Sequence, residues 1–232
     1  MRILCILLLT VLITLVPGLI GSLESAEQET IIDYAKEGSR VYALVKQKGP
    51  SGYRDYLVIN QRVEKGQDQQ IFKKDFMQLK PWKIEIADMD GDHEQEIIIA
   101  VHKTTHFDAQ EKNRLFILNF DGERLYKKWT GSQIAGVWND FHAEDFLPIQ
   151  GDELIFIEQV SDNRERICIY YWFDFGFVLL AASEVYGDIT AFCVIGENRI
   201  QITSHMGQEK KIRTLMVDNG KMIEVDQIRI ER

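Results

Sequence analysis

The stretch IADMDGDHEQEIIIAV, residues 86–101, places an acidic loop directly before an apolar run. The acidic residues of this loop are Asp88, Asp90, Asp92, Glu94 and Glu96. Because four of them alternate along a tight turn around Gly91, their oxygens can point toward one centre, with the backbone carbonyl of Glu94 as a further donor. Oxygen-only ligands with high charge suit Ca²⁺. The stretch therefore predicts a structural calcium loop between two β-strands.

A second copy of this pattern follows after 57 residues (145 − 88 and 153 − 96). AEDFLPIQGDELIFIE, residues 143–158, aligns Asp145 with Asp88 and Glu153 with Glu96, and two apolar runs follow each copy. A weaker third copy begins at residue 191 and contains Asn219-Gly220, a strong hairpin signal. Residues 39–79 supply roughly three further strands and lack a clear fourth. The chain thus reads as a series of repeated units.

Short β-branched and aromatic runs, separated by Gly, Asp and Asn, indicate an all-β protein. Repeated four-stranded units are typical of β-propeller blades, and the length allows about four of them. The terminal DQIRIER, residues 226–232, is expected to complete the first blade. A β-sandwich and a partial propeller remain open as alternatives. The expected strands are 41–45, 56–59, 71–76, 82–87, 96–101, 114–120, 124–129, 141–147, 154–159, 167–172, 177–183, 189–195, 199–203, 212–217 and 222–225.

The first residues predict export from the cytoplasm. Arg2 precedes an uncharged run, residues 3–16, so residues 1–26 are expected to be a signal peptide or an N-terminal membrane anchor. A buried core helix is the third possibility. Ser25 with Gln28 resembles a capping box, so a short helix or linker is expected over 27–38, before a propeller-like domain over 39–232.

Net charge narrows the classes of partner, and the sequence around the cysteines indicates whether they are buried or paired. A net charge of −9 without a basic cluster argues against nucleic acid and anionic lipid, and leaves the N-terminal segment as the only expected membrane contact. Cys168 and Cys193 each lie in an apolar run. Buried free thiols are favoured there, and a disulfide between the two is the alternative.

The acidic loop and its flanking strands resemble the FG-GAP or VCBS repeat, found in integrin α subunits and many exported bacterial proteins. In that family a D-x-D-G-D-x-x-x-[DE] loop binds calcium, which implies that role for the four alternating acids. The resemblance covers Pro81 to about Trp129, and the unit from Phe141 only in outline. His93 stands where the family usually has glycine, and the FG and GAP signatures are not recognisable. Leu147 and Ile149 replace two ligands in the second copy, so no ion is expected there.

These observations favour an exported, non-enzymatic binding module that presents a propeller face to a protein or glycan partner. The alternatives are an extracytoplasmic hydrolase or lyase and a membrane-tethered accessory subunit. Two other groups of residues have a composition and spacing that would suit a zinc site and an acid–base cluster. Their residues are His93, His102 and His106 for zinc, and Asn139, Asp140, His142, Glu144 and Asp145 for acid–base chemistry. The aromatic run 170–173 packs between units or lines a binding site.

Overall fold

The computed structural model describes residues 29–63, 68–130 and 133–225. In these residues the chain forms sixteen strands and one 3₁₀ turn, η1 (Met77–Leu79). The strands make four consecutive units of four. They are β1 (Glu29–Glu37), β2 (Arg40–Gly49), β3 (Gly52–Arg62) and β4 (Asp68–Asp75); β5 (Pro81–Ala87), β6 (Glu96–Thr105), β7 (Asp108–Phe120) and β8 (Leu125–Thr130); β9 (Val137–Glu144), β10 (Glu153–Ser161), β11 (Arg164–Phe173) and β12 (Gly176–Ser183); β13 (Asp188–Gly196), β14 (Arg199–Met206), β15 (Glu209–Asp218) and β16 (Lys221–Val225).

Each unit is an antiparallel meander, which confirms the prediction of an all-β protein. The first two units are separate four-stranded sheets. The third and fourth units form one curled eight-stranded sheet, because β12 pairs in parallel with β16 at Ala182↔Lys221 and Ser183↔Met222. Every expected strand overlaps an observed one. Asn219 and Gly220 both have positive φ in the β15–β16 hairpin, as the turn signal predicts.

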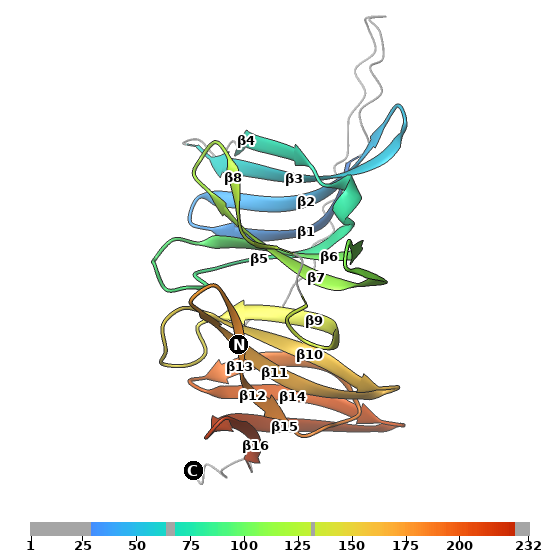
Figure 1. Ribbon diagram of the computed structural model, residues 1–232, viewed down its shortest axis with the longest axis vertical. Helices are drawn as coiled ribbons and strands as arrows, with labels where there is room; N and C mark the ends of the chain where they lie inside the picture. Colours follow the sequence, from blue (N-terminus) through green and yellow to red (C-terminus); the bar gives the residue numbers. More distant parts are fainter. Residues whose placement is uncertain (1–28, 64–67, 131–132, 226–232) are drawn as a thin grey trace, which may run out of the picture.

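The units pack face on face in chain order (Figure 1). One apolar cluster around Leu44, Leu57 and Ile99 lies between the first and second units. A second cluster, rich in aromatic rings, joins the second and third units, and a third cluster joins the third and fourth. The first and fourth units lie at opposite ends of the long axis. The strand expected to close a ring, residues 226–232, lies outside the described residues.

The helix expected over 27–38 is a wrong prediction, because residues 29–37 form β1. This strand is the fourth member of the first unit, which the sequence did not reveal. A β-bulge between Ile31 and Asp33 explains the error. The bulge breaks strict alternation, so Ile32 and Ala35 both pack against the core while Tyr34 is exposed, and this spacing imitates a helical period.

The topology gives the stack two rims. A four-stranded meander begins and ends on the same side, so all four units keep one orientation if they are joined by short connections. Contacts confirm this: Lys83 of β5 donates to Asp140 of β9, and Glu85, further along β5, accepts a bond from the N–H of Ala143, further along β9. Glu165 likewise bonds Asn139 near the start of β9 and Ile189 near the start of β13.

We call these two sides the hairpin rim and the acidic rim. The hairpin rim carries the β2–β3, β6–β7, β10–β11 and β14–β15 hairpins, which project to the right in Figure 1. The acidic rim carries the turns between the first and second strands of each unit and those between the third and fourth. Residues 88–95 and 145–152 both belong to the acidic rim.

Both cysteines that the structure describes are free. Cys168 is buried, as expected, and burial raises the pKa of its thiol to about 12. Cys193 is exposed, because it faces away from the core on the outermost unit. The described part of the chain holds no helix with the length and apolarity that a membrane crossing requires.

Candidate metal centre

Three of the predicted ligands converge at the junction of β5 and β6. Asp88 follows the last residue of β5, and Glu96 is the first residue of β6. One carboxylate oxygen from each of Asp88, Asp90 and Glu96 lies within 4.8 Å of the others. This spacing allows the three oxygens to share one cation.

The loop is shaped by its own carboxylates. Asp88 Oδ1 accepts a hydrogen bond from the Asp92 N–H at 3.1 Å, and Oδ2 accepts one from the His93 N–H at 2.9 Å. His93 has a φ of 69°, in the left-handed region, as its place at a glycine position of the family implied. Asp92 Oδ1 in turn accepts a bond from the Glu94 N–H at 2.8 Å.

Glu96 is fully buried and fixes the start of the loop. Its Oε2 accepts a hydrogen bond from the Met89 N–H at 2.9 Å, and its Oε1 accepts one from Asn119 Nδ2 at 2.8 Å. Burial raises the pKa of Glu96 above its ordinary value, although these bonds and Lys128 act in the opposite direction. A cation beside Glu96 therefore favours its charged form.

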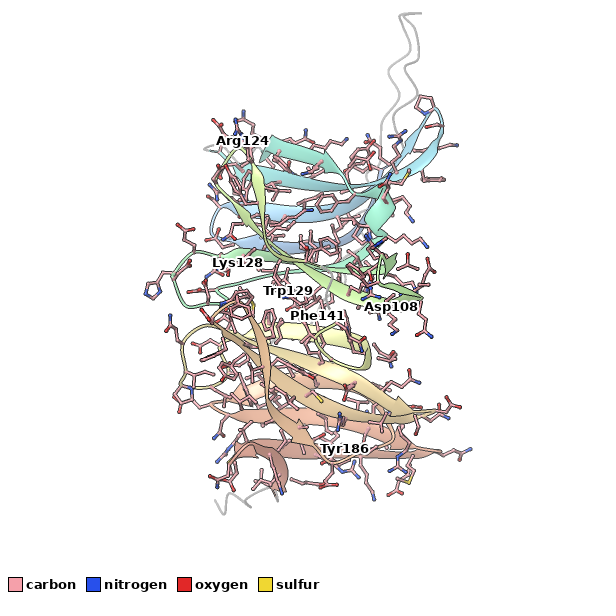
Figure 2. All side chains as sticks on the ribbon, viewed as in Figure 1. Asp108, Arg124, Lys128, Trp129, Phe141 and Tyr186 are labelled. Atoms are coloured by element: carbon pink, nitrogen blue, oxygen red, sulfur yellow. The ribbon has the colours of Figure 1, made fainter. Side chains whose placement is uncertain are left out.

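Lys128, on β8, supplies a cation that was not predicted from the sequence (Figure 2). Its Nζ lies 2.5 Å from Asp90 Oδ2, 2.8 Å from Glu96 Oε1 and 3.9 Å from Asp92 Oδ2. Burial by itself lowers the pKa of Lys128, but the bonds to Asp90 and Glu96 outweigh it, so the pKa is raised. The ammonium group relieves part of the repulsion that the loop creates.

The remaining donors fit a metal ion. Asp90 Oδ1 is buried and has no hydrogen-bond partner, so it is left as an unused acceptor. The side chains of Asp92 and Glu94 are exposed and stand outside the three-residue group. Asp88, Asp90 and Glu96 are thus the residues that would hold Ca²⁺, and the ion would replace the Lys128 ammonium at Asp90 and Glu96.

The acidic loop is locked against the corresponding loop of the third unit. The Asp152 N–H donates to Asp88 O at 2.7 Å, and the Asp88 N–H donates to Asp152 Oδ2 at 2.9 Å. Gln150 Nε2 also donates to Asp90 O at 2.9 Å. Gly91 and Gly151 both have positive φ and sit where a Cβ would collide with the opposite loop. The conformation of the acidic loop therefore depends on contacts between the second and third units.

Glu153 confirms that the two loops are structural repeats. Its Oε2 accepts bonds from the Phe146 and Leu147 N–H groups at 2.9 and 3.1 Å, just as Glu96 holds Met89. Asp145 is exposed, however, and no lysine in the described part of the chain pairs with Glu153. Burial raises the pKa of Glu153 to about 7, so below this pH a proton neutralises Glu153, whereas the Lys128 ammonium group neutralises Glu96 in the first loop.

Glu153→Gln is expected to stabilise the protein in mildly alkaline solution. The folded state holds the Glu153 proton up to about pH 7, whereas the unfolded chain releases it near pH 4.5. Between these values the folded state binds more protons, so wild-type stability falls as pH rises. Urea unfolding should show a gain of about 1–2 kcal/mol at pH 8 and little gain at pH 5. An equal effect at both pH values would contradict the buried proton.

The proposed zinc histidines are not brought together. His93 precedes β6 on the acidic rim, whereas His102 and His106 lie at the far end of the same strand. His102 Nδ1 is 3.0 Å from Asn113 Oδ1. In the described residues the single group with metal-ligand spacing is the acidic one, so the histidine interpretation is wrong in its geometry.

The proposed acid–base cluster is divided between two faces of β9. Asp140 and His142 face β5, where Lys83 Nζ lies 2.7 Å from Asp140 Oδ1 and His142 Nδ1 lies 3.0 Å from Glu85 Oε1. Asn139 instead bonds Glu165, and Glu144 and Asp145 are exposed. These contacts join the second unit to the third.

Comparisons with known proteins leave the family open. No protein-family model matches this sequence, and no curated protein matches it either. Among solved structures, the chain is similar to one described as "Structure of a Xanthomonas Type IV Secretion System related protein". The identity is 12%, the TM-score is 0.34, and the match covers 88% of this chain and 95% of that chain. At this TM-score the likeness carries no argument about fold or function.

Proposed function

We propose that this protein is an exported, non-enzymatic binding module, built as an open arc of propeller-type blades and regulated by Ca²⁺ at the acidic loop. The observation that carries this proposal is an apolar groove beside the loop. It has a volume of about 570 Å³. Its walls include Ile149, Tyr171, Trp172, Phe173, Val178 and Leu179.

Two contacts connect the groove to the cation. Trp172 forms part of the groove wall, and Lys128 Nζ lies 5.9 Å from the centre of its ring. Gln150, which also lines the groove, holds the backbone of Asp90. Calcium binding that displaces Lys128 from Asp90 and Glu96 therefore changes the surroundings of two groove residues.

The chemistry of the groove favours an apolar peptide segment over a sugar. Phe173 and Leu179 are exposed, and branched aliphatic side chains make up much of the wall. Exposed apolar patches of this kind mark protein-interaction sites. A sugar needs hydrogen bonds for its hydroxyl groups, and among the lining residues only Gln150, the Tyr171 hydroxyl and the Trp172 indole N–H could supply them.

The proposal can be tested with a displayed library of random peptides. The full chain should select peptides with two or more large apolar residues, and their binding should change between Ca²⁺ and a chelator. Leu179→Glu should reduce the binding at least tenfold, because it places a charge in the groove without touching the core. Ile212→Glu, exposed on the fourth unit, is the matched control and should leave it unchanged. Peptides that bind both variants equally well would refute the groove assignment.

A polar cleft on the other side of the loop keeps a glycan as the second candidate. This cleft, of about 630 Å³, lies between the first and second units. It combines the Tyr126 ring with hydrogen-bonding side chains, among them Arg40, Asn119 and Asp121. If the ligand is a sugar, binding on a glycan array should be lost in Tyr126→Ala and kept in Leu179→Glu. This result would assign the protein a glycan ligand in place of a peptide.

A further inference from the structure

We propose that the hairpin rim faces a lipid bilayer to which the chain is tethered through residues 3–20. The proposal does not depend on calcium or on the groove. It rests on where the chain reaches the folded body, on the side chains that the rim exposes, and on the distribution of charge between the two rims.

Glu29, the first residue that the structure describes, lies on the hairpin rim. Glu29, the first residue of β1, pairs with Gln47, and the β2–β3 hairpin turns at Gly49 and Gly52. Residues 3–20 carry no charge, and residues 21–28 separate them from Glu29. Eight residues span at most about 30 Å, even when fully extended. An anchored segment 3–20 therefore keeps this rim close to the membrane surface.

Each of the four hairpins on this rim exposes one large apolar side chain. The exposed fractions are 53% for Tyr53, 96% for Phe107, 49% for Val160 and 66% for Met206. They belong to four different units, so they form a row of separate contacts along the stack and not one continuous patch. Separate apolar and aromatic side chains suit insertion among lipid headgroups, whereas a protein partner needs a contiguous interface.

Charge distinguishes the two rims. The hairpin rim carries charges of both signs beside its exposed side chains. Its acids are mostly paired with lysines or arginines, as in Arg54–Asp75, Arg114–Asp108 and Lys211–Glu209. The acidic rim also exposes Phe175, but it collects the carboxylates of both acidic loops. A bilayer surface that contains anionic lipid repels unpaired carboxylates, so at such a surface the acidic rim is disfavoured relative to the hairpin rim. The net charge of −9, which argued against lipid binding, conceals this asymmetry.

The test uses the full chain in vesicles of phosphatidylcholine and phosphatidylglycerol. An environment-sensitive fluorophore is attached through Phe107→Cys or, as the matched control, Phe175→Cys, in a Cys5→Ser, Cys193→Ser background that leaves only the buried Cys168. Both positions are highly exposed hairpin phenylalanines, and they lie on opposite rims. Nitroxide-labelled lipid should quench the fluorophore at position 107 several-fold more than the one at position 175.

Equal quenching at the two positions, or none at position 107, would overturn the proposal and leave the rim to a protein partner. Met206→Cys against Ile195→Cys gives a second pair, if either first variant fails to fold. N-terminal sequencing of the protein from its native cells supplies the other readout. A chain that retains residues 3–20 is expected, and a chain that begins near residue 27 would remove the tether and with it the proposal.

Discussion

Lys128→Met is expected to make the stability of this protein depend more strongly on calcium. Lys128 is largely buried and pairs with Asp90 and Glu96. Removing one partner of a buried charge pair costs about 3 kcal/mol, because the other charges stay buried without compensation. In a chelator, urea or thermal unfolding should show this loss. Saturating Ca²⁺, at about 100 times its dissociation constant, should restore about 2.7 kcal/mol.

The same variant should also bind Ca²⁺ at least tenfold more tightly than the wild-type protein, since the ion no longer has to displace an ammonium group. Lys127→Met is the matched control, because Lys127 is the neighbouring residue on β8 and is exposed. Its site should bind Ca²⁺ about tenfold more weakly than that of Lys128→Met, so the same Ca²⁺ concentration should stabilise it by only about 1.4 kcal/mol. A Lys128→Met protein that is as stable as the control in a chelator would show that Lys128 does not compensate the loop.

Gly151→Ala is expected to destabilise the protein by disrupting the contact between the loops of the second and third units. At a φ of +80° a Cβ on residue 151 would lie 2.5 Å from Met89 O, a backbone atom that cannot move alone. The left-handed backbone and the forced separation of the loops together should cost about 3 kcal/mol.

Gly122→Ala separates the two causes of this loss. Gly122 also has a positive φ, of +101°, but nothing lies within 4 Å of the Cβ that alanine would add. It should lose only about 1 kcal/mol, the part due to backbone strain. Urea unfolding of both variants measures the difference, and equal losses would mean that the two loops do not hold each other in place.

Much of the fold could be predicted because the sequence repeats its local signals. The apolar runs and their turn residues located every strand from β2 to β16, and the 57-residue spacing identified Glu96 and Glu153 as equivalent. β1 escaped because its bulge between Ile31 and Asp33 disturbs the alternation that marks a strand. How the units sit relative to one another is a matter of contacts between distant side chains, which local patterns do not encode.

The candidate site, like the fold, could be predicted from the sequence only in part. Asp88, Asp90 and Glu96 could be found because they lie close together in the sequence around Gly91. Lys128 could not, because it is 32 residues from Glu96 and reaches the loop only through the pairing of β6, β7 and β8. The one available signal was a lysine at an alternate position of a short strand, which is far more often solvent-facing. The groove was also hidden, since Ile149 and Leu179 meet only after folding.

Calorimetric titration of the full chain with Ca²⁺ tests the central claim most directly. The account predicts one binding event per chain, which is lost in Asp90→Asn and retained in Asp145→Asn, the equivalent of Asp88 in the loop that carries a proton instead. If the wild-type protein gives no heat of Ca²⁺ binding, or if Asp90→Asn gives the same heat as the wild-type protein, there is no calcium site in residues 88–96.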